Sequence, residues 1–397
     1  MSLTHPTGNL NMNKNEFGSS RRKFLKTSGF GMLGFAGIAG LRGWMPSLPA
    51  SLQSEPEPEQ AHGEMSMSHS GFGAVGEVNH EANGFHPSDI LTDFDYGEII
   101  EENGQKIREW TVISTDKEIE IAPGIYFPAW VYGSATSETS KKAGKVVGTC
   151  PGPSLRCIEG ERLRVNFINA GSHPHTMHFH GVHAARHDGV PGAGDGMIAT
   201  GGSTVYEFNA KPYGCHLYHC HSLPLKRHVH KGLYGAFIVD PDPEKYSGAE
   251  KEAAKTRNHT YPENKNVNEV MMMMNGFDTN FDGDNEIYAA NTVAFAYRDH
   301  PIPITQDKIT RIYLINMTEF DPINSLHIHA NFFDYYDHGT TLTPTLKTVD
   351  TIMQCQAQRG IIEVSFADED FEPGMYMFHA HQSEFTELGW MGMLELS

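Results

Sequence analysis

Short runs in which apolar and polar residues alternate recur along the chain from about residue 95 onward. Examples are residues 108–114 and 162–169, and turn residues such as Pro151-Gly-Pro153 and Gly201-Gly202 separate the runs from one another. Alternation of this kind is typical of a β-strand with one buried face, and many short strands at such spacing indicate a β-sandwich. The pattern therefore predicts an all-β protein.

The alternating runs fall into two blocks, which we predict to be two domains, at residues 95–245 and 269–397. The stretch between them, residues 246–268, is polar and charged and is predicted to be an interdomain linker. Each block has the same order of parts: a strand, a His-x-His pair, a loop, a strand and a second His-x-His pair. This order indicates an internal duplication of pattern without identity of sequence.

The N-terminal part of the chain does not share this pattern. Residues 20–26 read Ser-Arg-Arg-Lys-Phe-Leu-Lys and precede a short apolar, glycine-rich run, so residues 1–50 are predicted to be a twin-arginine export signal. The apolar run is shorter than the roughly 20 residues that span a bilayer. Residues 51–94 are rich in Glu, Pro, Ser, Gly and His and are predicted to be a flexible linker. Together these features predict a periplasmic protein without a membrane anchor after signal removal.

Charge and cysteine content exclude some classes of function and structure. The formal net charge of −19 argues against a nucleic-acid partner. Five cysteines are an odd number, so no complete disulfide framework is expected. Cys150 and Cys157 are spaced so that they could pair, whereas Cys215 and Cys355 are predicted to be buried free thiols. The 23 histidines are the more informative number, because histidine is the commonest metal ligand.

Eight of these histidines form four His-x-His pairs, two in each block. One such pair on a strand is a weak signal, but four pairs at matching positions are a strong one. Imidazoles gathered around one centre need polar partners when they are buried, and metal ions would supply those partners. The pairs are His178 and His180, His219 and His221, His327 and His329, and His379 and His381.

A second centre is predicted within the first block. Successive side chains of a strand point to opposite faces, so Cys220 should face away from His219 and His221. Cys220 with His175 and His228 provides the two-His-one-Cys set of a blue copper site. The position of the weak axial ligand would fall on Leu233, and an apolar residue there should raise the reduction potential. His230 is the alternative to His228.

At these residues the chain resembles the multicopper oxidases. Residues 175–181 (His-Thr-Met-His-Phe-His-Gly) and 218–221 (Tyr-His-Cys-His) are similar to the most specific motifs of that family. Ala380 stands where the second block would carry a cysteine, a pattern similar to two-domain, laccase-like oxidases with the blue copper in domain 1. The resemblance implies two cupredoxin-like Greek-key β-sandwich domains and a homotrimer whose trinuclear sites form between subunits.

The resemblance also implies the role of each ligand. It assigns His178 and His327 to the type 2 copper, gives four coppers per subunit, and implies one-electron oxidation of a reducing substrate coupled to four-electron reduction of dioxygen to water. Protons are needed as well, and the candidate donors from the sequence are Asp337, Glu384 and Glu387. The type 3 pair would be held by His180, His219, His221, His329, His379 and His381.

Two other functions remain open from the sequence. A copper-containing nitrite reductase shares the two-domain trimeric design, but in its motifs an Asp stands where this chain has His178 and a non-ligand where it has His221. A periplasmic copper-binding or storage protein would not need the Cys220 connection between two centres. The electron donor is undefined: phenols, aromatic amines, Fe(II), Cu(I) and a small redox protein are all compatible. The loop Arg186-His-Asp188 has no assigned role.

Overall fold

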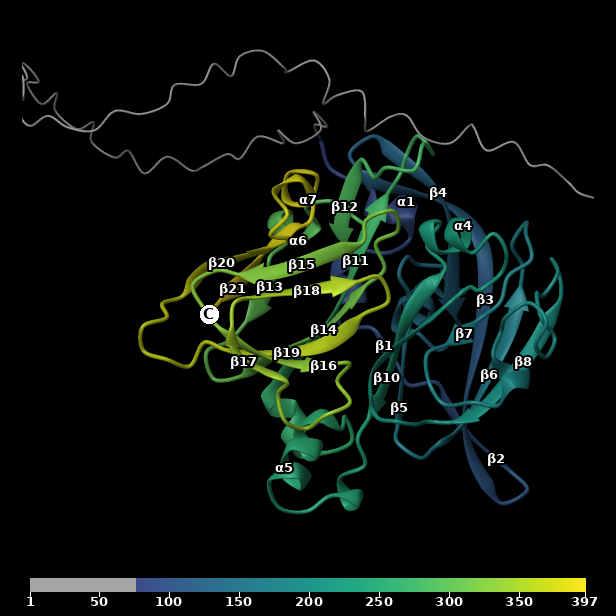
Figure 1. Ribbon diagram of the computed structural model, residues 1–397, viewed down its shortest axis with the longest axis horizontal. Helices are drawn as coiled ribbons and strands as arrows, with labels where there is room; N and C mark the ends of the chain where they lie inside the picture. Colours follow the sequence, from purple (N-terminus) through teal and green to yellow (C-terminus); the bar gives the residue numbers. More distant parts are fainter. Residues whose placement is uncertain (1–75) are drawn as a thin grey trace, which may run out of the picture. The chain divides into compact units, whose positions relative to one another are not determined.

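The computed structural model describes residues 76–397 (Figure 1). The predicted export signal and the first part of the predicted linker therefore lie outside the described residues. For residues 76–94 the prediction of a flexible linker is wrong. This segment forms the short helices α1 (His80–Asn83) and α2 (Pro87–Ile90) and leads into strand β1 (Phe94–Asp95). Phe85 and Ile90 anchor it, since both side chains are buried in a core that both blocks share.

The first block folds into two facing sheets, as the alternation predicts. One sheet has the order β1-β5-β10-β9-β7, with β5 (Gly152–Ile158), β10 (Tyr234–Asp240), β9 (Gly214–His219) and β7 (His178–Phe179). The other has the order β2-β3-β6-β8, with β4 paired to β3; its strands are β2 (Glu98–Glu102), β3 (Gln105–Ala122), β4 (Ile125–Ser134), β6 (Arg162–Asn169) and β8 (Ser203–Asn209).

The second block repeats the two-sheet design. One sheet runs β12-β11-β14-β19-β16-β17, with β12 (Ile287–Ala290), β11 (Val267–Phe277), β14 (Ile309–Asn316), β19 (Arg359–Ser365), β16 (Phe333–Asp337) and β17 (Leu346–Val349). The other runs β13-β21-β20-β15-β18, with β13 (Ile302–Ile304), β21 (Met391–Leu396), β20 (Gly374–His379), β15 (Ile323–Ile328) and β18 (Thr351–Cys355).

Helices are short and lie in the connections. The predicted interdomain linker contains the longest of the described helices, α5 (Gly248–Arg257). Besides α1 and α2, the remaining described α-helices are α3 (Glu138–Ala143), α4 (Leu225–His230), α6 (Ala296–Asp299) and α7 (Ser383–Glu387). Among residues 76–397 no helix combines the length and apolar character needed to cross a membrane.

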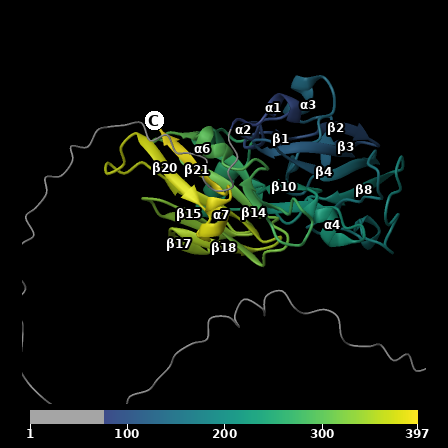
Figure 2. The ribbon, with the colours of Figure 1, turned by 90° about the horizontal axis from the view of Figure 1, so that it is seen from above.

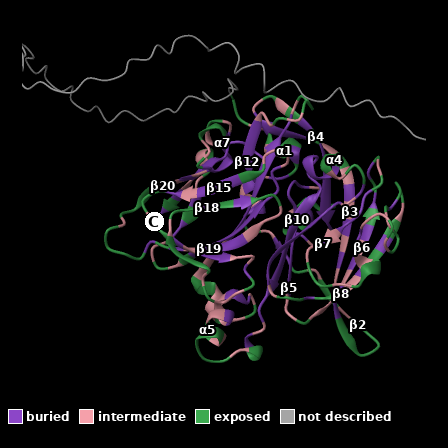
Figure 3. Ribbon diagram, in the orientation of Figure 1, coloured by how far each residue is buried: buried purple, intermediate pink, exposed green. Residues whose placement is uncertain are grey.

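The buried apolar side chains of the described residues form three clusters. Figure 3 marks the buried residues in purple along the strands. One cluster lies between the two sheets of the first domain and one between the two sheets of the second. The third joins the domains, because Leu217 and Ile238 of the first domain pack in the same cluster as Met271, Met273 and Ile315 of the second. The domains are therefore fixed to each other by apolar burial as well as by the chain that connects them.

A buried ion network crosses the same contact. Arg156 on β5 binds Asp240 on β10 at 3.0 Å and Glu269 on β11 at 2.8 Å. Glu269 also pairs with Arg311 on β14 at 3.0 Å, and Arg311 pairs with Glu363 on β19 at 2.8 Å. Burial alone would raise the pKa of Glu269, but the two guanidinium groups outweigh it and lower that pKa to about 2.

The structure answers whether Cys150 and Cys157 pair, which the sequence left open, and one other cysteine differs from expectation. Cys150 and Cys157 are separate buried thiols that form no disulfide: the Cys150 thiol lies 3.6 Å from the Tyr234 hydroxyl, and Cys157 lies 3.8 Å from the Ile238 carbonyl. Cys215 is buried as predicted, whereas Cys355, at the end of edge strand β18, is exposed. Alternation along β18 places Cys355 on its solvent-facing side together with Thr351 and Met353.

Candidate metal centres

The three residues predicted for the blue copper site converge in the first domain. His228 Nδ1 lies 3.2 Å from His175 Nδ1 and 3.3 Å from Cys220 Sγ, and Cys220 Sγ lies 3.9 Å from His175 Nδ1. All three side chains are buried. They come from different elements: His175 precedes β7, Cys220 directly follows β9, and His228 lies on α4. His230 points elsewhere, since its Nε2 accepts a hydrogen bond from the Asp278 amide at 3.0 Å.

The Cys220 sulfur accepts a backbone hydrogen bond and lies in a buried apolar cluster. The Thr176 amide donates to Cys220 Sγ at 3.3 Å, and hydrogen bonds around the sulfur are one of the means by which proteins set the potential of such sites. Leu233 is fully buried in the same apolar cluster as Cys220, and its carbonyl accepts the Cys220 amide at 2.9 Å. The Trp130 ring packs on His175 and His228, with centroid separations of 5.1 and 4.8 Å.

Cys220 also connects this centre to the first histidine set, which we name set 1 and which comprises His178, His180, His219 and His221. Strands β7 and β9 pair with His178 opposite His219. His180 Nε2 and His219 Nε2 lie 3.1 Å apart. Strand β9 ends at His219, so Cys220 and His221 lie just beyond it. The predicted alternation still holds there, because the rings of His219 and His221 are 5.6 Å apart on one side while Cys220 faces the other centre.

The second domain builds the same arrangement, which we name set 2 and which comprises His327, His329, His379 and His381. Strands β15 and β20 pair with His327 opposite His379. His329 Nε2 and His379 Nε2 lie 2.9 Å apart. The ring of His327 lies 5.3 Å from that of His381, the same separation as between His178 and His221 in set 1.

Hydrogen bonds orient corresponding rings in the same way. The Nδ1 atoms of His219 and His379 donate to the carbonyls of Cys220 and Ala380, at 3.0 and 2.5 Å. The Nδ1 atoms of His178 and His327 donate to the backbone carbonyls of Asp188 and Asp350, at 2.8 and 2.9 Å. Fixing the proton on Nδ1 leaves Nε2 with a free lone pair, as is usual for metal-ligating histidines.

Within one chain the two sets remain separate. Ring contacts link histidines inside set 1 and inside set 2, and none joins the two sets among residues 76–397. The sheets that carry them, β7–β9 and β15–β20, belong to different sandwiches (Figure 1). Within one chain the eight imidazoles therefore form two separate groups of four, and the prediction that such groups combine between subunits stays a prediction.

The acids next to these rings are not the predicted proton donors. Asp188 Oδ1 lies 3.2 Å from His178 Nδ1, and Asp350 Oδ2 lies 4.0 Å from His327 Nδ1. Asp337 instead ends β16, which belongs to the sheet without the histidine pairs, and pairs with His338 at 3.1 Å. Glu384 and Glu387 are exposed on α7. The sequence drew attention to the loop Arg186-His-Asp188, which contains Asp188, without assigning it a role. Nothing in the sequence pointed to Asp350.

Burial lowers the pKa of several of these rings and so favours their neutral form. Burial, followed by the neighbouring His219, lowers the pKa of His180 to about 3. Burial likewise lowers the pKa of His175, His219 and His228 to about 4. In set 2 burial lowers the pKa of His329 and His379. Neutral imidazole is the form that binds a metal, so these ligands need no deprotonation near neutral pH.

The donor set fits copper. Two imidazole nitrogens and a cysteine sulfur within 3.9 Å of one another are the ligands of a blue copper site. The all-imidazole sets suit copper as well, and His221 Nδ1 is buried without a hydrogen-bond partner.

Comparisons with known proteins agree with this reading of the fold and the donor set. Residues 129–244 and 257–396 match the multicopper oxidase family. A solved multicopper oxidase structure is 47% identical, covers 81% of this chain and 100% of that one, and superposes with a TM-score of 0.69. This chain belongs to the multicopper oxidase family, with two cupredoxin-like domains, and is a copper-dependent oxidoreductase by that membership.

Other relatives are more distant. A copper nitrite reductase structure from Nitrosomonas europaea is 19% identical with a TM-score of 0.57, covers 74% of this chain and 94% of that one, and shows likeness of fold alone. The probable nitrite reductase-hydroxylamine oxidoreductase fusion protein of Kuenenia stuttgartiensis is 27% identical over 69% of this chain and 30% of its own length. The copper resistance protein A homolog of Pseudomonas syringae pv. tomato is 33% identical over 27% of this chain and 18% of its own length. The matched parts thus span less than a third of these curated relatives.

Proposed function

We propose that the chain is a laccase-like oxidase that couples one-electron oxidation of a reducing substrate to four-electron reduction of dioxygen to water. The observation that carries the proposal is the position of Cys220 between two donor sets. Copper bound at these donors would supply one-electron redox chemistry at the Cys220 site and a store of several electrons at the histidine sets. A type 1 site at His175, Cys220 and His228 would receive electrons one at a time.

The chain itself provides the route between the sites. Cys220 Sγ faces His175 and His228, while the residues on either side of Cys220 in sequence belong to set 1. The bond from His219 Nδ1 to the Cys220 carbonyl, at 3.0 Å, adds a hydrogen-bonded path to the covalent one. A copper carrier would have no use for such a connection.

We further propose that set 1 of one subunit meets set 2 of a neighbour in a homotrimer. The assigned ligands are then His178 and His327 for type 2 copper and the remaining six histidines of the two sets for the type 3 pair. The separation of the sets within a chain supports this assembly, since each presents only four imidazoles. A cyclic trimer would bring three such pairs together by one repeated contact.

The deciding experiment is copper analysis of the loaded full chain together with oxygen consumption. The proposal expects about four coppers per chain, an intense blue band, one type 2 EPR signal and a type 3 absorption shoulder. With a phenolic donor, dioxygen should be consumed without accumulation of hydrogen peroxide, and light scattering should give three chains per particle. About two coppers and no type 3 absorption would contradict it.

Nitrite reduction is the second candidate, favoured by the relative from Kuenenia stuttgartiensis, a probable nitrite reductase-hydroxylamine oxidoreductase fusion protein. Against it stands the completeness of both four-histidine sets, since a type 2 copper needs only three imidazoles. Reduction of nitrite to nitric oxide by the reduced protein, with no dioxygen consumption, would establish this alternative.

We also propose export by the twin-arginine pathway and function in the periplasm. The support is the sequence Ser20-Arg-Arg-Lys-Phe-Leu-Lys26 ahead of a short apolar run. Replacing Arg21 and Arg22 by lysine should retain the precursor in the cytoplasm, and fractionation would measure this. Export that persists in the double variant would contradict it.

A further inference from the structure

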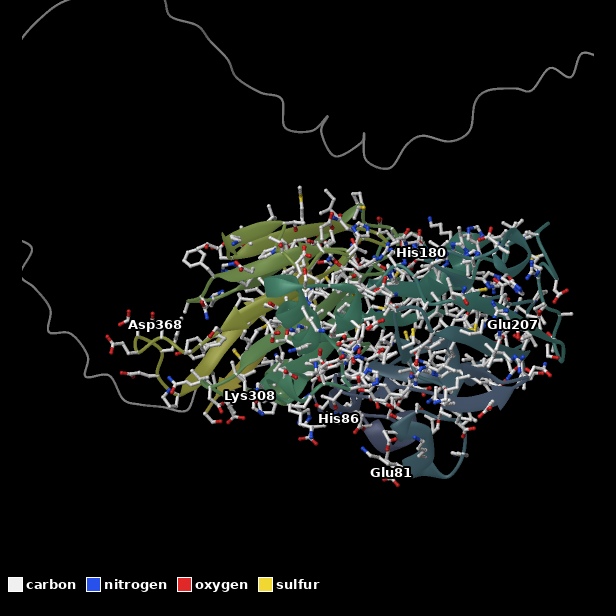
Figure 4. The ribbon with its side chains drawn as sticks, turned by 90° about the horizontal axis from the view of Figure 1, so that it is seen from below. Glu81, His86, His180, Glu207, Lys308 and Asp368 are labelled. Carbon is white, nitrogen blue, oxygen red and sulfur yellow. The ribbon has the colours of Figure 1, made fainter. Side chains whose placement is uncertain are left out.

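A third histidine cluster lies apart from the residues of both copper centres. It contains His80 on α1, His86 at the N-terminal cap of α2 and His300 directly after α6. One ring nitrogen from each lies within 4.8 Å of the other two. The ring centroids are 4.1 Å apart for His80 and His86 and 4.6 Å apart for His86 and His300. In Figure 4, His86 and His180 of set 1 lie on opposite sides of the described fold.

The cluster joins segments that are far apart in sequence. Helices α1 and α2 precede the first domain, whereas α6 belongs to the second; the three lie close together in Figure 2. The Tyr297 hydroxyl of α6 donates to the Pro87 carbonyl of α2 at 2.9 Å, which holds the two helices in contact. A contact that involves no histidine side chain therefore holds together the helices next to His86 and His300.

One nitrogen in the cluster lacks a partner. His80 Nδ1 is buried and has no hydrogen bond, although buried polar atoms nearly always have one. Burial, followed by His86 and His300, lowers the pKa of His80 to about 4, so its ring is neutral near pH 7 and keeps a lone pair. Two neighbouring carboxylates oppose this effect: Glu120 raises the pKa of His80, and Asp89 raises the pKa of His86, each by less than burial lowers it.

We propose that His80, His86 and His300 bind one divalent transition-metal ion of the imidazole-preferring class, Zn²⁺ or Cu²⁺. Three imidazoles without a thiolate are a common ligand set for these ions, with a fourth position left for water. The three rings line a hollow of about 450 Å³, together with Glu77 and Asp299, which leaves room for that water.

Binding requires a small local rearrangement. A tetrahedral ion at about 2.0–2.1 Å from each nitrogen holds the nitrogens about 3.3 Å apart. The three nitrogens here lie within 4.8 Å of one another. His86 Nδ1 accepts the Ser88 amide at 3.0 Å, which places the ring proton on Nε2. A half-turn of the His86 ring therefore exchanges one helix-cap hydrogen bond for a bond to the metal.

The consequence is a cross-link between the start of the described chain and the second domain. An ion that binds only the folded state stabilises it by mass action. The bridge closes a loop of more than 200 residues from His86 to His300, and bridging such distant positions removes much freedom from the unfolded chain. The role is structural, and it needs no change in the copper centres.

The test uses the full chain, loaded with about four coppers and shown by metal analysis to hold no further copper. This chain is titrated with Zn²⁺ by calorimetry. The wild type should bind one Zn²⁺ more than His300→Ala, a substitution at an exposed position just after α6. His80→Ala should lose the same site, with binding weakened by more than about a hundredfold. The matched control is His338→Asn, whose partly exposed ring pairs with Asp337 outside all three histidine clusters.

Two readouts separate loss of the site from loss of the fold. The blue absorption at Cys220 should be equal in wild type, both variants and the control, and Zn²⁺ should raise the melting temperature of the wild type and of His338→Asn only. Equal Zn²⁺ binding by wild type and His300→Ala, or no Zn²⁺ binding by the wild type, would show that the three rings are only an aromatic stack and overturn the proposal.

Discussion

Sets 1 and 2 have nearly the same geometry but different surroundings. Each pairs two strands with histidines in register, brings two Nε2 atoms to 3.1 or 2.9 Å and ties Nδ1 atoms to backbone carbonyls. In set 1 His219 is buried and continues into Cys220, whereas in set 2 His329 and His381 are exposed and Ala380 replaces the cysteine. This difference supports the proposal that set 1 receives electrons through Cys220 and that set 2 meets set 1 of another subunit.

The largest expected effect comes from removing one matched ligand from either set. His219→Ala and His379→Ala should each lower oxygen consumption by more than about a hundredfold, beyond the loss typical of residues that only support a ligand. His379→Ala should retain the blue band, because it leaves Cys220 and its partners untouched. Copper analysis and oxygen uptake measure both effects, and full activity in either variant would refute the assignment of that set.

Mixing the two variants tests whether the sets meet between subunits. A mixed trimer would contain one contact in which set 1 of a His379→Ala chain faces set 2 of a His219→Ala chain, so about a third of wild-type activity should return. Co-expression with two affinity tags isolates the mixed particles. If they stay as inactive as either parent, the two sets do not form a cluster between chains.

The next effect distinguishes the acids beside the two sets. Asp188→Asn removes a carboxylate 3.2 Å from His178 Nδ1 but keeps the backbone carbonyl that orients the ring. We expect about a hundredfold loss of turnover with copper content unchanged, and about tenfold for Asp350→Asn, whose carboxylate is 4.0 Å from His327.

The matched controls are Glu384→Gln and Glu387→Gln, which alter exposed carboxylates on α7. Both should leave turnover unchanged. A loss in Glu384→Gln with none in Asp188→Asn would instead support the proton donor chosen from the sequence.

These acids also show where inference from the sequence ends. The histidine sets proposed to bind copper could be predicted because period-two alternation and repeated His-x-His spacing determine which side chains share a face. Asp188 and Asp350 reach their histidines through loops, and loop geometry leaves no periodic trace. Asp337, eight residues after His329, lies instead on the neighbouring sheet. Spacing along the chain therefore misplaced Asp337, although it did place His228 of helix α4 beside Cys220.

The same limit applies to the fold. Two β-sandwiches followed from alternating runs and turn residues, but the polar composition of residues 76–94 concealed α1, α2 and their few buried anchors, such as Phe85. Composition averages over a segment, whereas two or three apolar side chains are enough to fix it on a core. The cluster of His80, His86 and His300 was missed for this reason.

A smaller expected effect concerns the contact that holds the two sets in a fixed relation within a chain. Glu269→Gln leaves Arg156 and Arg311 buried with one carboxylate fewer, which should lower the free energy of unfolding by about 3–5 kcal/mol. Glu269→Asp keeps the charge and is the control, expected to lose less. Chemical denaturation of the copper-free chain measures the difference, and equal stability of all three proteins would show that the network contributes little.

The wild-type network should also weaken in acid. The folded-state pKa of Glu269 is about 2, below the unfolded value of about 4.3, so its stabilisation is present above pH 4.3 and is lost as the pH falls through 2. The stability of the wild type should therefore fall more steeply in this window than that of Glu269→Gln. Parallel curves would contradict the assigned cause.

The smallest expected effect concerns the reduction potential of the Cys220 site, which has no counterpart beside set 2. Leu233 is buried beside Cys220 and offers no donor atom, so Leu233→Met should supply a weak axial ligand and lower the reduction potential by several tens of millivolts. Potentiometric titration of the blue band measures the shift, and Leu233→Ile, which adds no donor, should shift it far less. An equal shift in both variants would mean that packing around the sulfur, including the Thr176 amide at 3.3 Å, controls the potential instead of an axial atom. A shift only in Leu233→Met would show that the side chain at position 233 occupies the axial position of the Cys220 site, where the electron donor is expected to transfer its electrons.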